Sequence, residues 1–187
     1  MEKRWALSTW FASLLILFCG FARAGELAQD RWDQMALDKP EVVSAWLKEN
    51  AKTADRKRAQ VFFDEGTKYE KKGHWSMAVK SFGASALYFP TPMALIGDAD
   101  NTLRSLSTVR ARQKDTSKSK SDLEWALGTY RSALAAEEQL KMLSAQDLAQ
   151  LKADEACLDT YLKAPSLPIP KDAACRPLKL YAHSPPG

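Results

Sequence analysis

The sequence predicts an all-α fold, and two observations support this prediction. Apolar residues recur at three- and four-residue intervals through most of the chain after residue 25, which is the period of a helix with one buried face. Strand signals are scarce, since no Asn-Gly or Asp-Gly turn separates two alternating runs. The chain has 187 residues, enough for one ordinary domain with a sizeable core.

The first 24 residues have the three-part pattern of a secretory signal peptide. Lys3 and Arg4 give a basic start, residues 5–22 are mostly apolar, and Ala22-Arg23-Ala24 supplies small residues where a signal peptidase requires them. We expect cleavage after Ala24 and a periplasmic or secreted protein. The alternative is an uncleaved anchor, although the apolar run is short for a membrane span.

The mature chain carries no signal for nucleic acid or for a membrane as its partner. The formal net charge of the whole sequence is +4, and cleavage removes three basic residues and one acidic residue. The nearly balanced charge that remains argues against nucleic-acid binding. No second long apolar run follows, so we expect no stable membrane span after cleavage.

Three helices are expected in the first half of the mature chain. Residues 25–37 form a first amphipathic helix. The second covers 40–50 and begins at a proline, which the first helical turn tolerates, with Asp38 as its cap. The third runs to about residue 72 and is capped by Thr53 or Asp55.

Four more helices follow, for about seven in all. They cover 75–89, 93–109, the segment after Ser121, and 145–163, and Ser121 and Ser144 are expected to cap the last two. Residues 110–122 lack an apolar period and predict a solvated loop. Residues 164–187 are rich in proline and predict an extended tail without helix.

Two cysteines remain after cleavage, Cys157 and Cys175. An even number of cysteines in an exported chain indicates a disulfide, and closing this loop is worth about 3 kcal/mol in the chain-entropy model. A metal site is the alternative, but His74 and His183 lie far apart in the sequence and complete a poor ligand set. We therefore predict a structural disulfide, no metal and no cofactor.

The segment over 62–90 predicts a closely packed helical hairpin. Gly66 costs about 1 kcal/mol inside a helix, and this cost makes sense if a second helix approaches closely there. We expect Ala78 to be the small residue opposite Gly66, with Tyr69 and Phe82 filling the space on either side.

This hairpin resembles one unit of the tetratricopeptide repeat, a helix–turn–helix of 34 residues. The residues that fall on the pattern are Phe62, Gly66, Tyr69, Gly73, Trp75, Ala78, Phe82 and Pro90. A weaker second unit covers about 92–142, and its second helix carries Ala126, Tyr130 and Ala133. The resemblance implies a short α-solenoid of helical hairpins with N-terminal helices and a C-terminal capping helix.

In this family the first helix of each unit lines a concave groove that holds a partner's peptide. The resemblance implies that the groove residues are Phe63, Thr67, Glu70, Ile96 and Asp100. A subset of the family clamps a carboxylate with Lys and Asn at positions where Phe63 and Thr67 stand here, so we predict no such clamp. The alternative for Phe63 is burial beneath the N-terminal helices, which helical period alone does not distinguish from groove exposure.

The basic stretch between the two helices of the second unit is another candidate surface. Its residues are Arg110, Arg112, Lys114, Lys118 and Lys120. It would suit an acidic partner or an anionic envelope polymer. The alternative is a solvated loop without a partner, because serines alternate with the lysines.

No catalytic motif supports an enzyme. The sequence has no Ser/His/Asp arrangement, no Gly-rich phosphate loop and no paired-carboxylate catalytic motif. We therefore expect an exported scaffold or adaptor that binds a protein or peptide of the cell envelope. One alternative is an immunity or inhibitor protein that blocks a single exported enzyme, and another is a helical enzyme whose site no motif marks.

Overall fold

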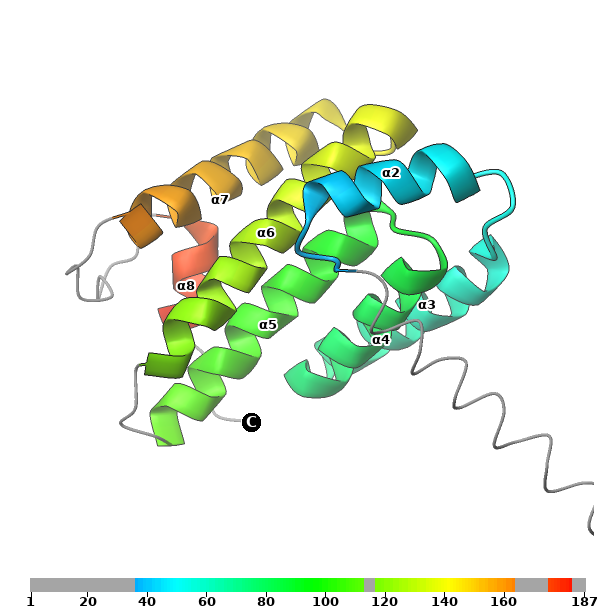
Figure 1. Ribbon diagram of the computed structural model, residues 1–187. Helices are drawn as coiled ribbons and strands as arrows, with labels where there is room; N and C mark the ends of the chain where they lie inside the picture. The colour runs from blue at the N-terminus through cyan, green and yellow to red at the C-terminus, as the bar shows by residue number, and fades with distance from the viewer. Residues whose placement is uncertain (1–35, 113–116, 164–174, 183–187) are drawn as a thin grey trace, which may run out of the picture. The chain divides into compact units, whose positions relative to one another are not determined.

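The computed structural model describes residues 36–112, 117–163 and 175–182. Within these ranges it contains seven helices and no strand, so the predicted all-α class is confirmed (Figure 1). The predicted signal peptide and residues 25–35 of the helix expected over 25–37 lie outside the described residues, and Ala36 and Leu37 are not helical.

The helices follow one another with short connections. They are α2 (Pro40–Asn50), α3 (Arg56–Lys71), α4 (Trp75–Tyr88), α5 (Pro92–Arg112), α6 (Ser117–Leu140), α7 (Ala145–Lys163) and α8 (Arg176–Ala182). From α3 to α7 each helix packs against the next one in the sequence, while α2 packs on α6 and α8 packs on α5 and α7 (Figure 1).

Local signals set several of the helix ends. The Asp55 carboxylate accepts a hydrogen bond of 3.0 Å from the Arg58 backbone N–H and caps α3. Ser144 accepts from the Asp147 backbone N–H at 3.1 Å and caps α7 as predicted, while the Asp147 carboxylate accepts a bond of 2.7 Å from the Ser144 hydroxyl. Gly73 ends the turn after α3 with φ of 72°, the left-handed conformation expected of it.

Two segments are more helical than the sequence indicated. The loop predicted over 110–122 is largely helix, since α5 continues to Arg112 and α6 already begins at Ser117 rather than at Ser121. Lysine, arginine and glutamine are good helix formers, and an apolar period reports burial rather than helix formation. The tail predicted to be extended contains α8, in which Pro177 occupies the first turn, where its missing N–H costs nothing.

Phe82 of α4 packs against both neighbouring helices, α3 and α5. Its ring lies against Gly66 of α3 and Gly97 of α5, and a Cβ added to either glycine would come within 2.9 Å of ring atoms. The close approach at Gly66 is therefore made by Phe82 rather than by Ala78, which is fully buried nearby in α4. Ser85 donates a hydrogen bond of 2.8 Å to the Ala59 carbonyl and fixes the antiparallel pairing of α3 and α4.

Gly128 of α6 allows the turn before α2 to pack closely on α6. A Cβ on Gly128 would lie 2.3 Å from the backbone carbonyl oxygen of Asp38, so only glycine fits beneath this turn. Asp38 does not cap α2 as expected, because Lys39 takes the capping position and no side chain bonds the first turn. Val43 and Leu47 of α2 are buried. Helix α2 thus packs on α6, in the pair formed by α5 and α6, rather than on the pair formed by α3 and α4.

Candidate functional site

A cavity of about 280 Å³ opens where α3, the end of α4 and the start of α5 meet. It is lined by Arg56, Ala59, Gln60, Phe63, Ser85, Phe89, Thr91, Met93 and Met142. The volume lies near the lower limit of small-molecule pockets and is of the size that one or two apolar side chains fill. The cavity therefore fits an anchor side chain of a peptide better than a large ligand.

Apolar side chains at the cavity are unusually accessible. Met93 is 46% exposed and Met142 is 53% exposed, although both are hydrophobic. Phe63 is half-buried, and its ring meets the ring of Phe82 edge to face at 5.4 Å between centroids. Methionine is flexible and polarisable, so it adapts to differently shaped apolar partners. An aromatic side chain held by a neighbouring ring, with two accessible methionines beside it, suits a contact with another protein.

The loop that carries Met142 is held in place by a buried carboxylate. Glu137 is 5% exposed and accepts hydrogen bonds from the backbone N–H groups of Met142 at 2.8 Å and of Leu143 at 2.9 Å. Arg56 also lines the cavity, and its guanidinium lies 4.5 Å from the centroid of the Phe89 ring. Both lining residues are thus held by contacts within the fold.

The five predicted groove residues do not share one open surface. Phe63 alone lines the cavity, and Thr67, half-buried one turn later, donates a hydrogen bond of 3.1 Å to the Phe63 carbonyl. Ile96 is half-buried. Glu70 forms an ion pair with Arg104 of α5, so its carboxylate is already committed within the fold.

Asp100 is buried rather than exposed on a groove. Its carboxylate accepts a hydrogen bond of 2.6 Å from the Tyr130 hydroxyl and another from the Arg176 guanidinium of α8. Arg176 also donates to Asp154 of α7 at 2.7 Å, and Asp154 accepts a further bond of 2.8 Å from Gln150. The chain's own C-terminal helix therefore occupies the position where the sequence predicted a partner.

Burial controls the ionisation of this network. It raises the pKa of the Asp100 carboxyl, and the Arg176 guanidinium offsets this only in part. Burial and the neighbouring Asp100 also raise the pKa of the Tyr130 hydroxyl, which keeps that group a donor. For Arg176, burial lowers the pKa, but Asp100 and Asp154 outweigh it and the net shift is upward. Arg176 thus stays charged between its two carboxylates.

The residues placed on the repeat pattern lie mostly in the interior. Ala126, Tyr130 and Ala133 of α6 are fully buried, as are Ala78 and Pro90. Phe62 stacks on Tyr88 with ring centroids 5.6 Å apart, and Trp75 lies beneath the Arg104 guanidinium at 5.0 Å. Tyr69 is half-buried and lies beside the ring of His74.

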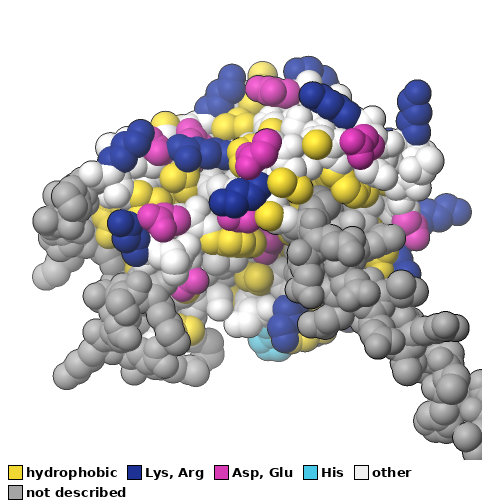
Figure 2. All heavy atoms as spheres, in the orientation of Figure 1, with side chains coloured by type: hydrophobic (Ala, Val, Ile, Leu, Met, Phe, Trp, Pro, Cys, Tyr) yellow, Lys and Arg dark blue, Asp and Glu magenta, His cyan; other side chains and the backbone are white. Residues whose placement is uncertain are grey.

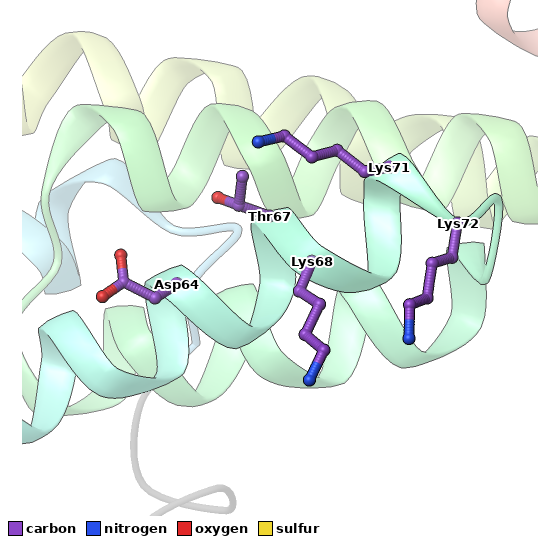
Figure 3. Close-up of a pocket in the computed structure, with 5 residues that line it drawn as sticks. All are labelled: Asp64, Thr67, Lys68, Lys71 and Lys72. Atoms are coloured by element: carbon purple, nitrogen blue, oxygen red, sulfur yellow. The ribbon is translucent and has the colours of Figure 1, made fainter.

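An open depression of about 450 Å³ lies farther along α3. Its lining residues in the described chain are Asp64, Thr67, Lys68, Lys71 and Lys72, which come from α3 and from the residue directly after it (Figure 3). Lys68 and Lys72 point to one side of the helix, whereas Lys71 extends back over Thr67 on the other side (Figure 3). Because Lys71 extends away from the other two lysines and one short stretch of chain supplies the described lining, the depression is not an enclosed anion site.

The predicted basic surface is only partly described. Lys114 lies outside the described residues, as do the side chains of Arg110, Arg112 and Lys118. Lys120 is exposed and its ammonium lies 3.8 Å from the Glu124 carboxylate one turn later. On the face shown in Figure 2, acidic and basic side chains are interspersed and neither sign forms a continuous patch.

Asp98 of α5 is a buried carboxyl for which the described residues supply no counter-charge. The residue is 2% exposed, and among the described residues its Oδ1 atom has no hydrogen-bond partner. Burial raises the pKa of this carboxyl well above its ordinary value. The cavity lining does not include Asp98, so this group belongs to the interior between helices.

The described residues hold no group of three or more His, Cys, Asp or Glu side chains arranged to bind a metal ion. In the same ranges no helix is long and apolar enough to cross a membrane. The predicted disulfide is present between Cys157 and Cys175, whose Cα atoms are 6.4 Å apart. His74 is exposed at the start of α4, and His183 lies outside the described residues.

No protein-family model, curated protein or solved structure matches the chain in comparisons of sequence and fold. The functional argument therefore depends on the residues and on the geometry described above.

Sequence reasoning missed Met93, Met142 and Arg56 as lining residues of the cavity. A methionine beside a helix end has the same pattern whether it is buried or exposed. Met142 also belongs to a different hairpin from Phe63, so only the folded chain brings the two together.

Proposed function

We propose that the protein is an exported helical-repeat scaffold that binds a segment of another cell-envelope protein. The observation that carries the proposal is the 280 Å³ cavity with Phe63 in its lining and with the exposed Met93 and Met142 at its rim. Exposed apolar side chains around a preformed pocket are typical of protein interaction sites. An apolar anchor residue of the partner would fill the cavity.

The repeat assignment is part of this proposal. It is supported by the successive packing of α3 to α7 and by the small residues Gly66 and Gly97 on either side of Phe82. Export is supported by the signal-like N-terminus and by the Cys157–Cys175 disulfide, since such bonds persist in oxidising compartments.

Site-specific photo-crosslinking from Met142 tests the proposal. A photoreactive amino acid at position 142 should trap one protein from the native envelope, whereas the same group at Val61 should not. Val61 is a matched control because it is a hydrophobic residue of α3 that is 66% exposed and lies outside the cavity lining.

The affinity of the trapped protein then decides. We expect Met142→Glu and Met93→Glu to weaken its binding by about tenfold or more, and Val61→Glu to leave it within about twofold. Equal trapping from both positions, or equal affinities of the three variants, would refute the cavity as the binding site. An exported enzyme that is trapped stoichiometrically and loses its activity would indicate the inhibitor class instead.

A further inference from the structure

The surface beneath α8 is built to receive an arginine. Asp100 of α5 and Asp154 of α7 come from different helices and converge on the single guanidinium of Arg176. Asp100 is 6% exposed and Asp154 is fully buried, and both are supported by other side chains, Tyr130 and Gln150. Removing the guanidinium from between two buried carboxylates would leave their charge uncompensated, which is strongly destabilising.

Two apolar contacts complete the recognition. Leu178 and Tyr181 of α8 are 4% and 3% exposed, while Lys179 between them faces solvent. α8 packs against both α5 and α7, which have little direct contact with each other (Figure 1). The surface of α5 and α7 beneath α8 therefore binds an arginine followed by apolar residues two and five positions later.

α8 itself has the character of a bound segment. It has only seven residues, and helices of this length do not form on their own in water. Its order therefore comes from the surface that it covers. Cys175 immediately precedes Arg176 and is bonded to Cys157 of α7, so the disulfide holds the segment directly at its anchor residue. Such a tether raises the local concentration of a weakly bound segment to about millimolar or above.

We propose that the surface of α5 and α7 beneath α8 is an interaction surface for a protein segment of the same chemistry, an arginine with apolar residues two and five positions later. In the disulfide-bonded chain, α8 is the resident occupant and competes with that segment. This surface is separate from the cavity at Phe63, and its proposal does not depend on the function proposed for that cavity.

A labelled peptide of residues 174–187, with Ser in place of Cys175, serves as the probe. Its affinity is measured by fluorescence anisotropy on two full mature chains, the disulfide-bonded protein and the Cys157→Ser/Cys175→Ser variant. An 18-residue loop gives a tether effect of at most about a hundredfold. We expect the double variant to bind the peptide about tenfold or more tightly than the disulfide-bonded chain does.

The anchor residue provides the specificity control. The peptide with Arg176→Ala should lose about tenfold or more of its affinity, whereas Arg131→Ala in the protein should change nothing, because Arg131 pairs with Glu155 and Asp159 and not with the two carboxylates that hold Arg176. No saturable binding by a folded double variant, or equal binding by both chains, would overturn the proposal.

Hydrogen exchange keeps the test decisive if the double variant does not fold. In the disulfide-bonded chain, the amides of α8 should exchange about a hundredfold or more faster than those of α6, through local release of α8. Exchange of α8 as slow as that of α6, with the same dependence on urea, would show that α8 is an integral part of the core and would refute its role as an exchangeable occupant.

Discussion

Replacing Gly66 with alanine tests the packing on which the helical-repeat assignment depends. The new Cβ would lie 2.9 Å from the Cγ and Cδ1 atoms of Phe82, whereas carbon atoms pack favourably at about 3.5–4.0 Å. The ring would have to move by about half an ångström or more. Its movement is restricted, because the ring also packs against Gly97 of α5 and meets the Phe63 ring edge to face.

Two opposing contributions set the magnitude. Alanine is favoured over glycine inside a helix by about 1 kcal/mol. Overpacking a core typically costs about 1–3 kcal/mol. Because Phe82 is 2% exposed and enclosed by three helices, we expect a cost in the upper part of that range. The free energy of unfolding should therefore fall by about 1–2 kcal/mol in Gly66→Ala.

Urea unfolding of the disulfide-bonded mature chain, followed by far-UV circular dichroism, measures this change. Lys68→Ala, at an exposed position of the same helix, should stay within about 0.5 kcal/mol of the natural chain. In a Phe82→Leu background the obstacle is smaller, so Gly66→Ala should become neutral or stabilising. If Gly66→Ala raises the urea midpoint equally in both backgrounds, the reasoning about the ring is wrong.

Three further predictions concern the other close contacts. Gly128→Ala should destabilise the protein by about 2 kcal/mol and speed hydrogen exchange in α2, because the obstacle is the backbone carbonyl of Asp38. Arg176→Ala should cost about 2–4 kcal/mol in urea unfolding, because it leaves two buried carboxylates unpaired, whereas Arg131→Ala should cost less than about 1 kcal/mol. Asp98→Asn should stabilise the protein at pH 8 by about 1 kcal/mol and by less at pH 4, as urea midpoints at the two pH values would show.

The pH effect follows from the raised pKa of Asp98. The folded chain holds this proton more tightly than the unfolded chain does, so the stabilising contribution is complete below about pH 4 and is lost as the pH rises through the folded pKa. Parallel pH profiles for Asp98→Asn and the natural chain would contradict this. Unchanged exchange of α2 in Gly128→Ala would mean that the turn at Asp38 moves freely. Equal costs for the two arginine variants would mean that the carboxylates find other partners.

Local interactions explain the features that the sequence predicted correctly. The caps at Asp55 and Ser144 and the left-handed Gly73 each depend on residues only a few positions away. The all-α class follows from apolar period, which is also local. The disulfide could be predicted because only Cys157 and Cys175 would remain after the predicted signal cleavage, which leaves one pairing.

Tertiary contacts decided the rest. Glycine at position 66 indicated a close approach, but only the folded hairpins showed that the Phe82 ring makes it. Arg176 reaches Asp100 across 76 positions of sequence, which converts a predicted groove residue into a buried one and makes a helix from a proline-rich tail. Helical period records which face of a helix is apolar, but it does not record which neighbour covers that face. That choice depends on long-range packing, and it determines which apolar residues, such as Met142, remain accessible to a partner.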